Sequence, residues 1–356
     1  MSLQRAFGKL NELGSDAFIA GTRFLSKRNW VSTSSADARI VGAGAFRYRV
    51  DHDWCKAMPD AVPVKNAHEM AIDADGHLYL LTDHPRNNVI VFDRDGCVLD
   101  TWTLGLRGAH GLTIATQDGR QCLWICDPYA AQVIQTTLKG EVLRRLPGPH
   151  ALGLYRALMP YAPTQTAVAP NGDIYVADGY GSQHVLQFDA AGNFIRHFGG
   201  KGSAPENLDF AHGIAIDSRK GRGHEVLLVT SRRQSCIKRF SLDGHYLGEI
   251  KLPGGYPCRP VLHGEHMLVS LCWSGAHMKP NSGFVVILDM HDRLCTALGG
   301  TATRDAQGEL VALQSSYDCF HHVHDVCADL SGNLYVAQWN ADGVYPWRLA
   351  AIAAPA

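Results

Sequence analysis

The sequence has no long apolar segment, no block of basic residues and no Cys-x-x-Cys pair. Its apolar runs fall far short of the roughly 18 residues that a membrane-spanning helix requires, so we expect no membrane insertion. Ten cysteines are scattered along 356 residues, which is typical of reduced thiols rather than of a disulfide framework or a thiolate zinc site. A net charge of −1 without basic blocks argues against binding to nucleic acid.

The amino-terminal segment also lacks the uninterrupted apolar stretch of a signal peptide, because Arg5, Lys9, Glu12 and Asp16 interrupt it. Together with the scattered cysteines, this favours a cytoplasmic location. Apolar residues make up 46% of the chain and charged residues 19%, which is enough apolar material for a sizeable core. We therefore expect a globular chain of one large or two ordinary domains.

The chain repeats one pattern of strands. Residues 67–102 and 163–199 both read as an apolar strand, a glycine turn, a second apolar strand, a polar loop and two further strands. The same frame begins again near residues 109, 211, 258 and 323. Six four-stranded units of about 40 to 50 residues are typical of an all-β, six-bladed β-propeller. A β-sandwich has similar turn spacing but does not explain self-similarity over this range.

The last unit runs out of sequence after about three strands, whereas an early strand near residue 45 belongs to no unit. We expect this early strand to complete the last sheet and so close the ring. The predicted organisation is an N-terminal extension over 1–44, a propeller over 45–347 and a C-terminal tail over 348–356. A short helix is expected over 3–13.

Histidine, with 18 residues, is the one over-represented chemical type. The innermost strand of every propeller blade begins at the same face of the central channel, so equivalent positions form a ring around the axis. Aligning the six units at that position gives His68, His110, Thr164, His212, Arg259 and His324. A single such histidine is more often structural. Histidines in three alternate blades, however, favour a three-nitrogen metal site with an open position, as in catalytic zinc.

The loop between the second and third strands of each blade opens on the same face as this ring. These loops carry Arg86, Tyr180, Arg232, Trp273 and Trp339. Arginine binds a carboxylate with two hydrogen bonds, a tyrosine beside a metal can act as acid or base, and tryptophan walls exclude water. The loops therefore predict a small anionic substrate. Simple packing of the two tryptophans in the propeller mouth is the alternative.

At these residues the chain resembles the NHL-repeat propellers, and among them the peptidylamidoglycolate lyase domain of peptide α-amidating enzymes. The resemblance covers residues 64 to about 345 and is closest at 163–188. It implies zinc bound by His110, His212 and His324, as the ring alignment also predicts. It further implies that Tyr180 is catalytic.

The same resemblance implies that Arg232 is also catalytic and clamps the carboxylate of the substrate, with Arg86 as a further substrate arginine. It implies a structural calcium site formed by Asp325 and the backbone carbonyl of Leu112. His68 has no counterpart in that family. We expect His68, Arg259, Trp273 and Trp339 to contribute to substrate binding. The disulfide cysteines of the family are replaced by Gly181 and Arg239, in agreement with reduced thiols.

The reaction implied by the resemblance is cleavage of a carbinolamide, R–CO–NH–CH(OH)–COO⁻, into an amide and glyoxylate or a related 2-oxo acid. Within enzymes, the alternative is a metal-dependent hydratase, dehydratase or lactonase acting on a small hydroxy acid. Outside enzymes, the alternative is a non-catalytic NHL binding scaffold, although a scaffold has no use for three convergent histidines. The substrate's identity and the oligomeric state stay open.

Overall fold

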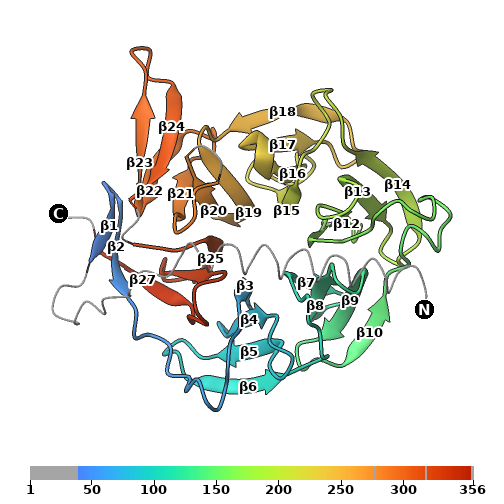
Figure 1. Cartoon of the computed structure of the whole chain (residues 1–356), viewed down its shortest axis with the longest axis horizontal. Helices are drawn as coiled ribbons and strands as arrows, with labels where there is room; N and C mark the ends of the chain where they lie inside the picture. The colour runs from blue at the N-terminus through green and yellow to red at the C-terminus, as the bar shows by residue number, and fades with distance from the viewer. Residues whose placement is uncertain (1–38, 276–277, 317–318, 354–356) are drawn as a thin grey trace.

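A computed structural model describes residues 39–275, 278–316 and 319–353. Their strands form six sheets around a common axis and one two-stranded hairpin (Figure 1). This confirms the predicted all-β, six-bladed β-propeller. The helix expected over 3–13 lies outside the described residues. Within them, the single turn of 3₁₀ helix η1 (Arg232–Gln234) is far too short to cross a membrane, and no other helix has the length and apolarity to do so.

Each of the first five blades is a four-stranded antiparallel sheet. Blade one contains β3 (Ala67–Ile72), β4 (Leu78–Thr82), β5 (Val89–Phe92) and β6 (Val98–Trp102). Blade two contains β7 (Gly111–Gln117), β8 (Arg120–Asp127), β9 (Gln132–Thr137) and β10 (Val142–Arg145). Blade three contains β11 (Gln165–Val168), β12 (Ile174–Ala177), β13 (His184–Phe188) and β14 (Phe194–Gly199).

The remaining blades follow the same order. Blade four contains β15 (Ala211–Asp217), β16 (Val226–Ser231), β17 (Cys236–Phe240) and β18 (Tyr246–Lys251). Blade five contains β19 (Gly255–His263), β20 (His266–Ser274), β21 (Phe284–Leu288) and β22 (Leu294–Leu298). The hairpin of β23 (Gly300–Arg304) and β24 (Leu310–Ser315) follows and extends outward from the ring (Figure 1).

Strands from both ends of the sequence close the sixth blade. β25 (Val323–Ala328), β26 (Leu334–Gln338) and β27 (Trp347–Ala351) are followed in the sheet by β2 (Phe46–Asp51) and β1 (Ile40–Ala43). The predicted closure of the last sheet by an early strand is therefore confirmed. β1 lies before residue 45 and most of β27 after residue 347, so this sheet extends beyond the range expected for the propeller.

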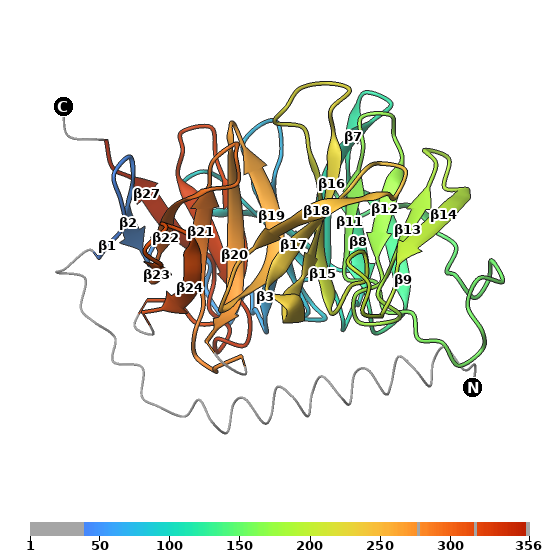
Figure 2. The same cartoon turned by 90° about the horizontal axis from the view of Figure 1, so that it is seen from above.

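Burial explains the apolar pattern of the strands. The second and third strands of a blade are covered by neighbouring blades on both faces, and β4 and β5 are accordingly buried at every residue. The outermost strands are covered on one face, and β18 accordingly alternates between exposed and partly or fully buried residues. Figure 2 shows the ring from the side, with the blades standing next to one another.

The start of each innermost strand lies beside the end of the second strand, because the two are antiparallel. Ala67 pairs with Thr82, Gln165 with Ala177 and Val323 with Gln338. The predicted ring of aligned residues and the loops between second and third strands therefore share one face of the propeller. We call it the histidine face.

Val50→Asp should lower the free energy of unfolding by about 3 kcal/mol or more, because it buries an unpaired charge where the ring closes. Val50 is buried and pairs with Leu349 across the β2–β27 junction. Urea unfolding followed by tryptophan fluorescence measures the change. The exposed neighbour Arg49 provides the control, since Arg49→Ala should change stability by less than about 0.5 kcal/mol. Equal losses in both variants would contradict a ring held closed by β2.

Candidate active site

His110, His212 and His324 meet at the axis of the propeller. Their ring centroids are 4.6, 4.8 and 4.9 Å apart, nearly an equilateral triangle. His110 directly precedes β7, and His212 and His324 are the second residues of β15 and β25. All three are buried. The alternate-blade histidines that the repeat singles out are thus brought together by the fold.

Backbone carbonyls fix two of these rings. Nδ1 of His110 lies 2.9 Å from the carbonyl of Thr164, and Nδ1 of His324 lies 2.9 Å from the carbonyl of His68. A carbonyl only accepts, so each Nδ1 carries the proton and each Nε2 keeps its lone pair. Metal-binding imidazoles are commonly oriented in this way.

His212 is fully buried, and among the described residues neither of its ring nitrogens has a hydrogen-bond partner. Leaving buried polar atoms unpaired costs about 1–3 kcal/mol, so a ligand at His212 is favoured. Three converging imidazoles, two with oriented lone pairs and one unpaired, suit a divalent cation such as zinc. The histidine donors therefore suit a divalent cation, but the sets of described donor atoms that lie within 4.8 Å of one another do not unite His110, His212 and His324.

Two further residues belong to this layer. The ring of His68 lies 5.1 Å from that of His110 and 4.9 Å from that of His324. Donor atoms of His68, His110 and His324 lie within 4.8 Å of one another, and so do those of His212, Cys258 and His324. We call the aligned positions the histidine layer. Its members are His68, His110, Thr164, His212, Cys258 and His324.

Cys258 corrects the alignment of the fifth repeat. Sequence comparison assigned Arg259 to the ring, but the thiol of Cys258 is the group that lies beside His212 and His324. A bulge between Pro257 and Pro260 matches the bulges between Ala67 and Met70 and between Ala211 and Ile214, so Cys258 is the counterpart of His68 and His212. Matching Pro-Cys-Arg-Pro to Val-His-Asp-Val from its first residue would have found Cys258.

Tyr180 reaches the histidine layer from the loop after β12. Its hydroxyl lies 2.8 Å from Nε2 of His110, and its ring lies 5.7 Å from that of His212. The loop is held by the carboxylate of Asp178, which accepts from the N–H groups of Ala162 and Ser182 at 2.7 and 2.8 Å. The Asp-Gly-Tyr sequence thus directs the phenol at the axis.

Arg232 lies beside Tyr180 and is only 2% exposed. Its Nη2 donates to the thiol sulfur of Cys258 at 2.8 Å and its Nε to the carbonyl of Pro257 at 3.3 Å. The guanidinium also stacks on Phe210 and Trp273 at 5.4 and 5.1 Å from the ring centroids. Phe210 was not predicted, and no pattern in the sequence marks it.

The other predicted loop residues differ in their relation to this site. Trp273 and Trp339 are buried, with ring centroids 6.1 Å apart, and pack in one cluster with Cys258 and Cys272. Arg86 is exposed on the loop between β4 and β5, where its backbone N–H donates to His84. No contact described for Arg86 joins it to the histidine layer.

Burial dominates the electrostatics of the site. It lowers the pKa of His110, His212 and His324 well below the ordinary value, and the charge of Arg232 adds to this lowering. The three imidazoles are therefore neutral at pH 7, as metal ligands must be. Burial also raises the pKa of Tyr180, while Arg232 acts in the opposite direction.

The implied calcium site is not available. The guanidinium of Arg259 binds both carboxylate oxygens of Asp325, at 3.0 and 2.7 Å, and the carbonyl of Leu112 at 2.9 Å. The oxygens expected to hold calcium are thus engaged by a cationic side chain, and calcium does not fit there. For the same reason Arg259 is not available to bind a substrate carboxylate, so both expectations are corrected.

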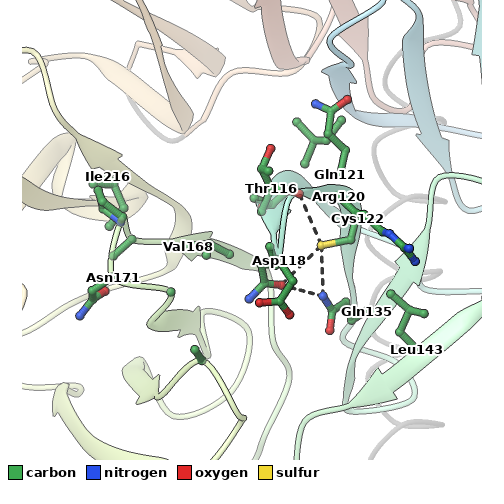
Figure 3. A pocket seen from close by; sticks show the side chains of 18 of the residues that line it. Thr116, Asp118, Arg120, Gln121, Cys122, Gln135, Leu143, Val168, Asn171 and Ile216 are labelled. Atoms are coloured by element: carbon green, nitrogen blue, oxygen red, sulfur yellow. Dashed lines mark hydrogen bonds between the residues drawn. The ribbon is translucent and has the colours of Figure 1, made fainter.

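A hollow of about 1170 Å³ lies elsewhere, at the opposite end of the innermost strands (Figure 3). It is lined by the turn at Asp118, by Arg120 and Gln135, and by the turn at Asn171 (Figure 3). None of the predicted site residues lines it. The histidine layer, with its converging buried donors, is therefore the candidate site.

Comparisons with known proteins agree with the fold. A family described as a 6-bladed beta-propeller matches residues 166–270. A probable peptidyl-α-hydroxyglycine α-amidating lyase of Caenorhabditis elegans is 26% identical over 215 residues, which are 54% of this chain and 57% of that protein. Peptidyl-α-hydroxyglycine α-amidating lyase 1 of Drosophila melanogaster is 33% identical over 261 residues, 69% of this chain and 45% of that protein.

The chain thus spans about half the length of the curated relatives it matches. Among solved structures, a streptogramin B lyase superposes with a TM-score of 0.55 at 12% identity, covering 81% of this chain and 94% of the other. At this identity the likeness shows a shared fold. The motifs predict a resemblance to amidating lyases, and the names of these two sequence relatives confirm it.

Without bound metal, the protein should lose stability as the pH falls below about 6.5, the ordinary histidine pKa. The folded pKa values of His110, His212 and His324 are lowered, so the unfolded chain binds more protons in this range. Each histidine then contributes a slope of up to about 1.4 kcal/mol per pH unit. Urea unfolding of chelator-treated protein between about pH 7.5 and 5.5 measures it.

The variant His212→Gln should show a shallower pH dependence than the unmodified protein, because one of the three depressed pKa values is removed. His291→Ala, at an exposed position, should leave the dependence unchanged. An identical slope in all three proteins would show that His212 is not buried in its neutral form.

Proposed function

We propose that this six-bladed β-propeller, related in sequence to proteins named as peptidyl-α-hydroxyglycine α-amidating lyases, is a metal-dependent lyase. Its substrate would be a small anionic α-hydroxy amide of the carbinolamide type. The products would be an amide and glyoxylate or a related 2-oxo acid. The convergence of three buried imidazoles, one phenol and one buried guanidinium on the histidine face supports this function best.

His110, His212 and His324 would hold a zinc ion through their ring nitrogens. Such an ion supplies positive charge that acidifies a bound hydroxyl group and a neighbouring phenol. The carbonyls of Thr164 and His68 keep the Nε2 atoms of His110 and His324 aimed at the axis. Burial keeps all three rings neutral, so that no proton competes for the lone pairs.

Tyr180 would carry the proton of the reaction. Cleavage of a carbinolamide removes the hydroxyl proton, breaks the carbon–nitrogen bond and protonates the departing amide nitrogen, so one group can take the proton and return it. The phenol now donates to Nε2 of His110. A cation held by that nitrogen would leave the hydroxyl of Tyr180 available to the substrate. Burial raises its pKa, and the nearby guanidinium opposes this rise.

Arg232 would bind the carboxylate of the substrate. Its contacts with Cys258 and Pro257 use two of the five N–H groups of a guanidinium, so others can donate to a ligand. A buried arginine attracts an anion more strongly than an exposed one, because little water screens it. Trp273 and Phe210 flank the guanidinium and limit access of water.

Protein purified without chelators should contain about one zinc ion per chain, and His212→Ala should lose it, because a three-nitrogen site loses a ligand. Elemental analysis after gel filtration measures the content. His291→Ala serves as the matched control and should retain the metal. Absence of any transition metal from the unmodified protein would contradict the metal-dependent proposal and favour a binding scaffold.

Tyr180→Phe should reduce turnover of an α-hydroxyglycine-type carbinolamide by about 100-fold or more while the metal content stays unchanged. The variant keeps the ring and removes the group that moves the proton. Glyoxylate release under substrate saturation gives the rate. Tyr246→Phe, on the outermost strand β18, should keep full turnover. Unchanged turnover in Tyr180→Phe would exclude this tyrosine as the proton carrier.

A further inference from the structure

A second set of aligned residues lies directly after the histidine layer in each innermost strand. We call it the charged layer. Its members are Glu69, Gly111, Gln165, Gly213, Arg259 and Asp325. Glu69 and Asp325 are fully buried, and the side chain of Arg259 is 11% exposed. Two carboxylates and one guanidinium are therefore enclosed together near the axis.

Arg259 contacts three other blades from blade five. Its Nη2 donates to the carbonyl of Met70 in blade one at 2.8 Å, and its Nη1 donates to that of Leu112 in blade two at 2.9 Å. Asp325 of blade six accepts from Nε and Nη2 at 3.0 and 2.7 Å. Nη1 also lies 3.7 Å from the carboxylate of Glu69.

The two carboxylates have further donors from the same layer. Glu69 accepts from the backbone N–H of Leu112 at 2.7 Å and from the side-chain amide of Gln165. Asp325 accepts from the backbone N–H of Met70 at 2.8 Å. Such an acidic pair would be costly to bury without a cation, and Arg259 is the cation that it contacts.

Two glycines keep this layer compact. A Cβ on Gly111 would overlap the carbonyl of Thr164, and a Cβ on Gly213 would overlap that of Cys258 and approach the Cα of Arg259 to 2.6 Å. The blades therefore approach closely enough for a single side chain to reach across the axis. An arginine has the length and the number of donors for this, since its fork offers five N–H groups.

We propose that Arg259 is a built-in cation that takes the place of a structural metal ion on the axis and positions the strands that carry the histidine layer. Calcium binds carboxylate and carbonyl oxygens at about 2.3–2.6 Å. Arg259 binds the same kinds of oxygen through N–H groups, and both cations cannot occupy that space. The propeller is accordingly independent of calcium.

Positioning follows from the sequence neighbours of these oxygens. Asp325 directly follows His324, Glu69 directly follows His68, and Leu112 is two residues after His110. The guanidinium thus ties together three strands that present imidazoles. Outer contacts that orient metal ligands typically change metal affinity by about 10- to 100-fold. This positioning role rests on the proposed metal site, whereas calcium independence does not.

The test compares the unmodified protein with Arg259→Ala in thermal unfolding, with a calcium chelator or with millimolar calcium chloride. The unmodified protein should have the same Tm in both. Arg259→Ala should unfold on the order of 10 °C lower in chelator, because it leaves two buried carboxylates without their cation. Calcium should restore a substantial part of this loss by occupying the vacated oxygens.

A matched double variant checks the ligand. Arg259→Ala combined with Asp325→Asn should gain no stability from calcium, because the carboxylate that would bind the ion is gone. For the positioning role, Arg259→Ala in chelator should bind zinc at least about 10-fold more weakly in a competition assay, and calcium should recover affinity. Turnover is not needed for either measurement, so failure of the lyase proposal is distinguishable from failure of this one.

Three results would overturn the proposal. The first is a tightly bound calcium ion in the unmodified protein, or a Tm of that protein that rises with calcium. The second is an Arg259→Ala variant as stable as the unmodified protein in chelator. The third is a destabilised Arg259→Ala variant that calcium does not stabilise. An Arg259→Ala variant that folds only when calcium is present during purification supports the proposal. If the variant never folds, the test is whether calcium changes the Tm of the unmodified protein.

Discussion

Convergence of six innermost strands on one axis is the constraint on which the rest of this structure depends. Residues far apart in the sequence, such as His110 and His324, are brought to ring distances below 5 Å because each begins an equivalent strand. The carbonyl of a neighbouring innermost strand then sets which nitrogen of each ring is protonated. Fold and site chemistry are therefore linked through the backbone itself.

The axis carries two layers with opposite requirements. In the histidine layer, burial keeps His110, His212 and His324 neutral, and His212 has no hydrogen-bond partner among the described residues. The next layer holds Glu69 and Asp325, which both pair with Arg259, and burial raises the pKa of both carboxyl groups. Burial favours neutral imidazoles in the histidine layer. In the charged layer, it makes an unpaired charge costly and so favours ion pairs. A set of histidine donors and a set of paired charged groups thus lie one residue apart along the innermost strands.

Loop residues add groups that the ring alone lacks. Tyr180 and Arg232 reach the histidine layer from blades three and four, and both are enclosed by aromatic side chains. Enclosure raises the pKa of the phenol, and the guanidinium partly offsets that rise. The guanidinium of Arg232 donates to the thiol of Cys258 and so connects blade four to blade five. From composition alone, this cysteine is expected only to pack in the core.

The sequence by itself determined the number of blades, the closure by an early strand, the three alternate histidines and the face on which the loop of Tyr180 opens, because all of these follow from a repeat whose period is visible. Tertiary structure decided what the residues of blade five contact, because Cys258 lies beside His212 and His324 whereas Arg259 pairs with Asp325 in the next layer. Tertiary structure also leaves Arg86 exposed. It places the guanidinium of Arg259 on Asp325 and on the carbonyl of Leu112, the two groups expected to bind calcium. A repeat fixes the position of a residue along a strand, but the partners of a long charged side chain are fixed only by the blades that surround it.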